Sequence, residues 1–215
     1  VTTHGPNTGL NTFFFEDFEA SNSFDDWTVG TGPGPHRCGD WERTNTSTQR
    51  PSGGGGYYAR SLSESCIPLL PQTSTYLDSP AIDFTQYTGV QWVTLEFDIY
   101  YAYLDGGDDA TMEVWDGSTW HVLWSDSDTN VNGHLTYDVT AYAVGNPEFR
   151  VRFNYQNANS DRWYSVDNVK LGGLIENPCF ASATPASVPD GSGAKAGFHA
   201  DRLTVSGDSI QLSWD

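Results

Sequence analysis

Short clusters of acidic residues beside glycine, asparagine and serine are the part of this sequence best suited to do chemistry. One is the run 105–109, written DGGDD, and another is the run 126–133, where Asp126, Asp128 and Asn130 alternate. Ca²⁺ takes about six to eight oxygen ligands from carboxylates, amides and backbone carbonyls, so loops of this composition suit it. The acids would equally keep a secreted protein soluble.

The run 126–133 departs from a helix-flanked calcium loop in two ways. Its sixth position, where a sharp turn needs glycine, holds Val131, and no glutamate follows at its twelfth position. We therefore favour a solvated loop between two strands.

Glu96 and Asp98 raise the question of hydrolysis, because strand alternation would place both on one face, a sound geometry for acid and nucleophile work. Jelly-roll glucanases carry the pattern E-x-D-x-x-E on such a strand, but here Tyr101 stands where the last glutamate belongs. The sequence also lacks an H-E-x-x-H helix, a G-x-S-x-G elbow and a phosphate loop. We expect no enzyme, with a jelly-roll glycoside hydrolase or lyase as the less favoured alternative.

The charge balance narrows the range of partners. Ten Lys and Arg stand against 28 Asp and Glu, a formal net charge of −18, so no basic stripe is present to neutralise phosphates. No apolar run reaches the roughly 18 residues that span a bilayer. These features argue against nucleic-acid partners and membrane insertion. We expect a secreted protein, extracellular or at the cell surface, whose signal peptide has been removed or lies outside this sequence.

Three cysteines leave one without a partner inside the chain. Cys38 and Cys66 lie in loop-like sequence and are predicted to form a disulfide, which requires an oxidising compartment. Cys179 is then left over, either as a free thiol or with a partner outside these residues.

Alternating apolar residues predict the elements that hold these groups. Val93, Leu95, Phe97 and Ile99 share one face of a strand and are expected in the core, with Glu96 and Asp98 on a wet face. Further strands are predicted at 111–115, 120–124, 135–139, 149–155 and 163–171, with an Asp-Gly hairpin turn at 116–117. Short strands, many turns and 14% aromatic residues predict an all-β antiparallel sandwich.

Composition divides the chain into four parts. We expect an N-terminal extension at 1–12, the sandwich domain at 13–173, a linker at 174–200, and at 201–215 the truncated start of a second β-domain. Inside the sandwich, the Gly-, Pro- and Ser-rich region 30–56 is predicted to be a long surface excursion, and Gly53–Gly55 a flexible turn within it.

Several stretches in this order resemble one known group. "FEDFE", "FDDWTVG", "DWERT", "GGYYA", "TYLDSPAIDF", "LEFDIYY" and "WYSVDNVKL" are similar to the bacterial MAM-like jelly-roll modules, also called choice-of-anchor J domains. The resemblance implies a β-sandwich accessory module attached to secreted proteases, glycosidases or adhesins. Related carbohydrate-binding sandwiches hold a structural Ca²⁺.

The resemblance also implies a metal site. In the wider jelly-roll set, the glutamate of an N-terminal "FE" meets the first acid of a C-terminal "D-D/N-V"; here these are Glu19 and Asp167. Asn168 stands where the group often has a second aspartate and is a further candidate ligand through its amide oxygen. Asp40 is a further candidate ligand, and the adjacent acids Glu16 or Asp17 would replace Glu19 if the strand register slips. The alternative is that these are ordinary strand-end acids accepting backbone hydrogen bonds.

The segment "FFFEDFE" at 13–19 is predicted to be the first strand, with rings buried on both faces and its acids at the exit from the core. Exposed rings elsewhere would offer stacking platforms for sugars, and the candidates are Trp115, Trp163, Tyr101 and Tyr103. The favoured alternative for any single one of them is a place in the core or at its rim, because large aromatic rings usually fill such sandwiches.

Together these observations predict a non-catalytic, Ca²⁺-stabilised accessory module of a multidomain secreted protein. Its expected partners are a polysaccharide or cell-surface glycan and the neighbouring domains of the parent chain. The alternative is a purely structural spacer or a protein-interaction and adhesion module.

Overall fold

The computed structural model describes residues 10–34, 36, 38–66, 73–104, 108–158, 162–175, 200–206 and 209–214. The chain divides into two compact units, Leu10–Ile175 and the remaining residues at both ends. In the second unit the described residues form one antiparallel hairpin, β12 (Ala200–Ser206) with β13 (Ser209–Trp214). That this hairpin begins a further β-domain stays a prediction. No described helix is long and apolar enough to cross a membrane.

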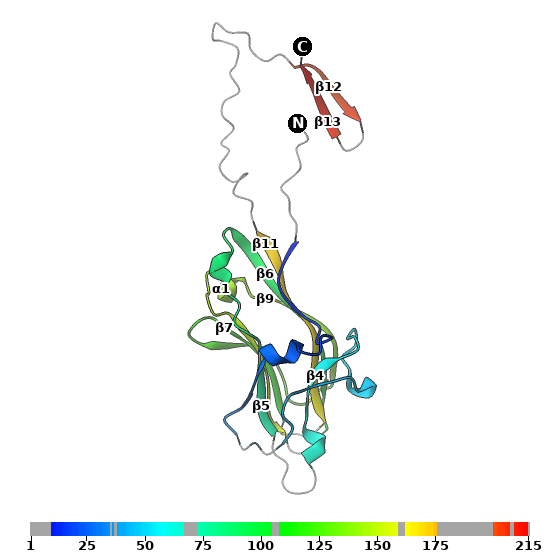
Figure 1. The fold of residues 1–215 in the computed structure, drawn as a ribbon, viewed down its shortest axis with the longest axis vertical. Coiled ribbons are helices and arrows are strands. Elements are labelled where there is room, and N and C mark those ends of the chain that lie inside the picture. Colours follow the sequence, from blue (N-terminus) through cyan, green and yellow to red (C-terminus); the bar gives the residue numbers. More distant parts are fainter. Residues whose placement is uncertain are drawn as a thin grey trace. The chain divides into compact units, whose positions relative to one another are not determined.

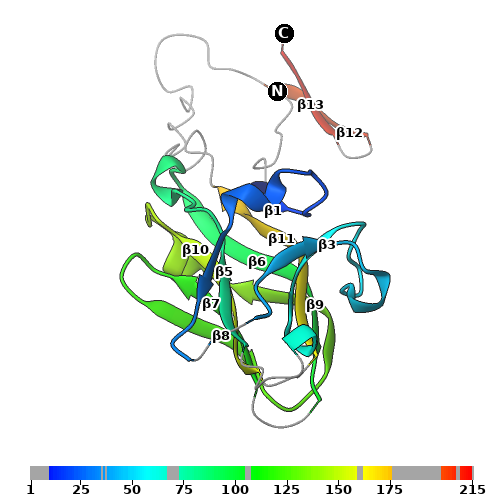
Figure 2. The same cartoon turned by 60° about the horizontal axis from the view of Figure 1, so that its bottom comes forward.

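The unit Leu10–Ile175 is a sandwich of two antiparallel sheets (Figure 1 and Figure 2). The six-stranded sheet has the order β3-β4-β11-β6-β9, with β1 also paired to β11, and the five-stranded sheet has the order β2-β5-β10-β7-β8. The predicted all-β antiparallel sandwich is confirmed. The strands are β1 (Leu10–Glu16), β2 (Thr28–Thr31), β3 (Glu42–Thr44), β4 (Tyr58–Leu62), β5 (Thr73–Asp78), β6 (Val90–Ala102), β7 (Asp109–Trp115), β8 (Trp120–Asp126), β9 (Val131–Asp138), β10 (Arg150–Ala158) and β11 (Trp163–Ile175).

In the described residues of this unit, helical structure is confined to single turns. They are the 3₁₀ turns η1 (Ser23–Asp26), η2 (Ser47–Gln49), η3 (Ser63–Cys66) and η4 (Phe84–Gln86), and the α-helical turn α1 (Thr140–Ala143). The region 30–56 therefore contains β3, η2 and the end of β2, so the prediction of one long excursion without structure is wrong. Strands β2, β3, β4 and β5 were not predicted from the sequence.

Aromatic rings from both sheets fill the space between them. Phe153 of β10 lies at the centre, with its ring centroid 5.2 Å from that of Phe97 on β6 and 6.2 Å from that of Tyr164 on β11. Trp27 and Trp41 close around it, each with centroids 6.4 Å away. Rings prefer such tilted and edge-on contacts, so this cluster ties the two sheets to each other.

Strand β6 shows how well alternation predicts the core face. Val93, Leu95, Phe97 and Ile99 are all fully buried between the sheets, as predicted. The opposite face is not uniformly wet, because Asp98 is also buried.

Strand β11 changes its neighbour halfway along one edge. Residues 163–166 pair with β4, residues 169–174 pair with β1, and β6 pairs along the other edge. Asp167 and Asn168 fall between the two partners, where the pairing with β6 also shifts register. The side chains at this point are therefore near the end of β1 and the start of β4 together.

Strand β1 corrects the interpretation of the FFFEDFE segment. A register shift between Thr12 and Phe14 leaves Phe13 and Phe14 both half-buried, while Phe15 is 52% exposed. The prediction that rings are buried on both faces of this strand is therefore wrong at Phe15.

Replacing Phe153 with alanine should lower the free energy of unfolding by about 3–5 kcal/mol, because it opens a cavity at the centre of the ring cluster. Urea denaturation followed by tryptophan fluorescence measures this. Phe15→Ala is the matched control and should change stability by no more than about 0.5 kcal/mol. Equal losses in the two variants would contradict the packing described.

Candidate functional site

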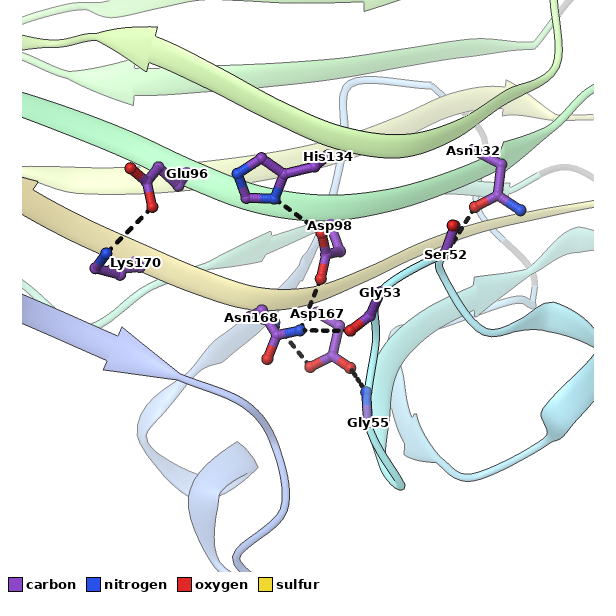
Figure 3. Close-up of polar contacts among 10 residues, drawn as sticks. All are labelled: Ser52, Gly53, Gly55, Glu96, Asp98, Asn132, His134, Asp167, Asn168 and Lys170. Carbon is purple, nitrogen blue, oxygen red and sulfur yellow. Dashed lines mark hydrogen bonds and ion pairs between the residues drawn. The ribbon is translucent and has the colours of Figure 1, made fainter.

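Two carboxylates meet a glycine run at the point where β11 changes neighbour. Asp167 is fully buried, and its Oδ2 accepts a hydrogen bond of 2.8 Å from the Gly55 amide. Glu19 follows β1, and its Oε1 accepts a hydrogen bond of 2.9 Å from the Tyr57 amide. We call Glu19, Gly53–Tyr57, Asp98, Asp167 and Asn168 the carboxylate junction; Figure 3 shows its part around Asp98 and Asp167.

The glycine run packs too closely on the acids to carry side chains. A Cβ atom on Gly54 would lie 2.7 Å from Asp167 Oδ2, and Gly53 has φ +98° with Asp98 Oδ2 3.0 Å from the place of its Cβ. The predicted turn is present, since the Gly54 amide donates to the Pro51 carbonyl at 3.0 Å, and its glycines lie directly against the carboxylates.

Asp98 is held by two side chains, those of His134 and Asn168, rather than left free for catalysis. Its Oδ1 lies 2.9 Å from His134 Nδ1, and its Oδ2 accepts a hydrogen bond of 2.7 Å from Asn168 Nδ2 (Figure 3). Asn168 Nδ2 also donates to the Gly53 carbonyl at 3.2 Å. On the same strand Glu96 pairs with Lys170. The predicted acid pair is therefore engaged in structural contacts.

Two residues at the junction hold left-handed backbone. Phe18 has φ 54° and Asn168 has φ 51°, conformations that cost non-glycine residues about 1–3 kcal/mol each. Glu16 Oε1 accepts a 2.6 Å hydrogen bond from the Phe18 amide, and Asp17 Oδ1 accepts one from the Glu19 amide. Glu16 and Asp17 thus form the turn, and Glu19 is the acid of this segment that contacts the glycine run.

The buried carboxyl of Asp167 is hard to ionise in this setting. Burial raises its pKa to about 7; the amides of Asn168 and Gly55 oppose the shift, and the nearby Asp98 and Glu19 add to it. Among the described residues, no Lys or Arg forms an ion pair with Glu19 or Asp167. A cation would stabilise these charges. Within the same residues no set of three Asp, Glu, His or Cys side chains is placed to hold a metal ion, so a cation here would also need amide or backbone oxygens.

The other predicted cation ligands lie elsewhere. Asp40 contacts His36 at 2.8 Å with 68% of its side chain exposed, and no contact joins it to the junction. The loop between β8 and β9 is stabilised by its own acid, since Asp126 Oδ1 accepts hydrogen bonds from the amides of Asp128 and Thr129. Residues 105–107 of the DGGDD run lie outside the described residues.

Most of the rings predicted to be platforms for sugars are packed inside the domain. Tyr101 is fully buried among Trp124, Tyr155 and Tyr164, and Trp163 is only 8% exposed, so the prediction of exposed rings is wrong for both. Tyr103 is half-buried at the end of β6, where its amide donates to Asn130. Trp115 lines a hollow on the outer face of the five-stranded sheet.

Cys38 is disulfide-bonded. The side chain of its predicted partner Cys66, and all of Cys179, lie outside the described residues, so this pairing stays a prediction.

The outer face of the five-stranded sheet carries two hollows. The aromatic hollow, about 250 Å³, is lined by Asp78, Trp115, Trp120, Glu148, Arg150 and Arg152. The polar hollow, about 460 Å³, is lined by Asp109, Ala110, Thr111, Glu113, Ser125, Asp126, Ser127, Asp128, Asn154 and Gln156.

Arg152 organises the aromatic hollow. Its guanidinium donates to both carboxylate oxygens of Asp78, at 2.6 and 2.8 Å, and lies over the rings of Tyr76 and Trp120, at 3.9 and 4.0 Å from their centroids. The Trp115 and Trp120 centroids are 5.4 Å apart, with the rings tilted by 51°. Burial alone would lower the pKa of Arg152, but Asp78 and Glu113 outweigh it and raise that pKa, so the guanidinium stays charged.

Sequence reasoning missed Trp120 and Tyr76. The Asp-Gly turn at 116–117 was a usable signal for Trp120, because a hairpin there places Trp120 opposite Trp115. No local pattern pointed to Tyr76, whose position depends on β5 pairing with β10.

No family model matches the sequence, and no curated protein matches it. Solved structures do match. The K1 cleaved adhesin domain of Lys-gingipain from Porphyromonas gingivalis W83 is 15% identical with a TM-score of 0.53, covering 75% of this chain and 97% of that chain. TmCBM61, solved in complex with β-1,4-galactotriose, is 12% identical with a TM-score of 0.51, covering 75% and 97%. TmCBM27, a carbohydrate-binding module studied for mannan recognition, is 13% identical with a TM-score of 0.50, covering 78% and 99%.

At these identities the likeness shows the fold alone. This chain has the β-sandwich fold that carbohydrate-binding modules and adhesin domains also have.

The raised pKa of Asp167 gives a pH dependence to the metal-free protein. The folded protein binds this proton more tightly than the unfolded chain, whose carboxyl ionises near about pH 4, so ionisation opposes folding. The contribution to stability is full below about pH 4 and is lost as the pH rises through about 7. In EDTA, Asp167→Asn should therefore gain stability relative to the unmodified protein between pH 5 and pH 8, measured by urea denaturation.

Asp25→Asn, at an exposed acid, should show no such pH-dependent gain. If the difference between Asp167→Asn and the unmodified protein were the same at both pH values, the buried, uncompensated state of this carboxyl would be refuted.

Proposed function

We propose that this chain is a non-catalytic, glycan-binding accessory module that binds its ligand on the outer face of the five-stranded sheet. The observation that carries this proposal is the stack of Trp115, Trp120, Arg152 and Tyr76 beside a polar hollow on one open sheet face. Sugar rings present apolar faces to aromatic rings and hydroxyl groups to carboxylates and amides, and this surface offers both.

The comparisons with solved structures support the general proposal of a glycan-binding module. TmCBM61 is described with a bound β-1,4-galactotriose and TmCBM27 with mannan recognition. These ligands belong to those proteins, and the identity of the glycan bound here follows only from experiment.

Adhesion is the second candidate function, because the K1 domain of Lys-gingipain with the same fold is an adhesin domain. A protein-interaction or spacer role would not need the hollows. Hydrolysis has less support, since Asp98 is covered by the glycine run and Glu96 pairs with Lys170.

The proposal extends to the setting of the module. We place it in a secreted or cell-surface, multidomain protein, and the disulfide at Cys38 supports an oxidising compartment. Membership of the MAM-like or choice-of-anchor J group rests on the sequence resemblance.

We also propose that Ca²⁺ stabilises the carboxylate junction. Glu19 and Asp167 would be ligands, since both carboxylates lie against the glycine run without a basic partner among the described residues. Asn168 would position the site, because its amide already bridges Asp98 and Gly53. The ion would supply the positive charge that the buried carboxylates lack.

Ca²⁺ at about 100 times its dissociation constant should stabilise the module by about 2.7 kcal/mol, raising Tm by about 5–10 °C over the value in EDTA. Differential scanning calorimetry measures this. Glu19→Gln and Asp167→Asn should each abolish the shift, whereas Asp40→Asn should keep it. An unchanged Tm of the unmodified protein in Ca²⁺ and EDTA would remove the metal from the account.

Trp120→Ala should weaken glycan binding at least about tenfold, because it removes a ring and the support beneath Arg152. A polysaccharide array identifies the ligand, and isothermal titration calorimetry compares the variants. Phe15→Ala removes an exposed ring outside the hollows and should leave binding unchanged. Absence of binding to every glycan tested would favour the spacer or adhesion role.

A further inference from the structure

The two hollows form one continuous surface. Outward-facing residues of β7 and β10 line both, and Glu113 and Arg152 lie opposite each other in the ladder where the hollows meet. From Trp115 to Asp109 the strand covers about 20 Å at the usual rise per residue. This length suits a short stretch of a glycan chain rather than a single sugar.

The polar hollow is strongly acidic. Four carboxylates line it, those of Asp109, Glu113, Asp126 and Asp128, and no Lys or Arg is among its described lining residues. Hydrogen bonds hold these groups in place: Glu113 Oε1 accepts from Thr111 and Asn154, and Asp109 Oδ2 accepts from Asn157. Ionised carboxylates held in this way accept hydrogen bonds from hydroxyl groups and repel anions.

A buried amide in the same hollow supports a ligand there. Asn154 is only 6% exposed and lines the hollow, and its Oδ1 has no hydrogen-bond partner among the described residues. A buried polar atom without a partner is costly, and a hydroxyl-bearing ligand or the water it displaces would supply one.

The aromatic hollow does not offset the negative charge of the polar hollow. Arg152 is paired with both oxygens of Asp78, and Glu148 lines the hollow beside Arg150. Among the described residues, Arg150 is thus the one cation lining the aromatic hollow without an ion pair. The adjacent polar hollow holds four carboxylates.

We infer that this face binds an uncharged glycan chain across both hollows and that the carboxylates of the polar hollow reject polyanionic glycans. The inference rests on the proposed function and adds the substrate class. Trp115 and Trp120 contact sugar faces at one end, and the acids and Asn154 bind hydroxyl groups at the other.

The test compares glycans that differ in charge but share a backbone: methyl-esterified, neutral polygalacturonate with polygalacturonate, and neutral β-1,4-mannan with polymannuronate. Affinity electrophoresis at low salt measures binding of the whole chain. We expect whichever neutral member binds to bind at least about tenfold tighter than its anionic counterpart. Asp109→Asn/Asp128→Asn should lower the ratio of neutral to anionic affinity, because it removes two of the charges that repel the polyanion.

The control Asp25→Asn/Asp40→Asn removes the same charge outside both hollows and should leave the ratio unchanged. Equal binding of the neutral and anionic chains, an equal effect of the two double variants, or tighter binding of cationic chitosan than of any neutral chain would each overturn the inference while glycan binding stood. Absence of binding to all chains would overturn the proposed function and the inference with it.

Discussion

The structure depends on one constraint: β11 shares a single edge between two strands. Its first half pairs with β4 and its second half with β1, so Asp167 falls where neither strand can cover it. The glycine run before β4 fills this gap, and it can do so only because no Cβ intervenes between its backbone and the carboxylates. The loop that carries the glycine run thereby links Glu19, which follows β1, with Asp167 on β11.

The same arrangement separates the roles of the two outer faces. On the six-stranded sheet, the glycine run covers Asp98, and the acids of this face take part in hydrogen bonds and ion pairs. On the five-stranded sheet, the outward side chains of β7 and β10 stay uncovered and form the hollows. The acids of one face are thus held in contacts within the fold, whereas the other face carries hollows that a ligand can enter.

Local sequence patterns predicted the parts of the fold that depend on residues close together in the chain. Alternation identified the core face of β6, and the Asp-Gly turn identified the β7–β8 hairpin. Alternation failed where segments distant in the chain determine burial. It placed Asp98 on a solvent-exposed face, but a loop some forty residues earlier in the chain covers this side chain. The resemblance pointed to Glu19 and Asp167, and the structure brings both against the glycine run. The resemblance gave no indication of Asp98 or of Arg152 stacked between rings, because strand pairing creates those contacts.

The division between the two faces is the central claim, and mapping amide and indole NMR shifts during titration with a bound neutral oligosaccharide tests it most directly. The account predicts that the shifts gather on β7, β8 and β10, including the indole groups of Trp115 and Trp120, with little change at Gly53–Tyr57. Shifts concentrated at the glycine run and around Asp98 and His134, with the five-stranded face unchanged, would contradict it.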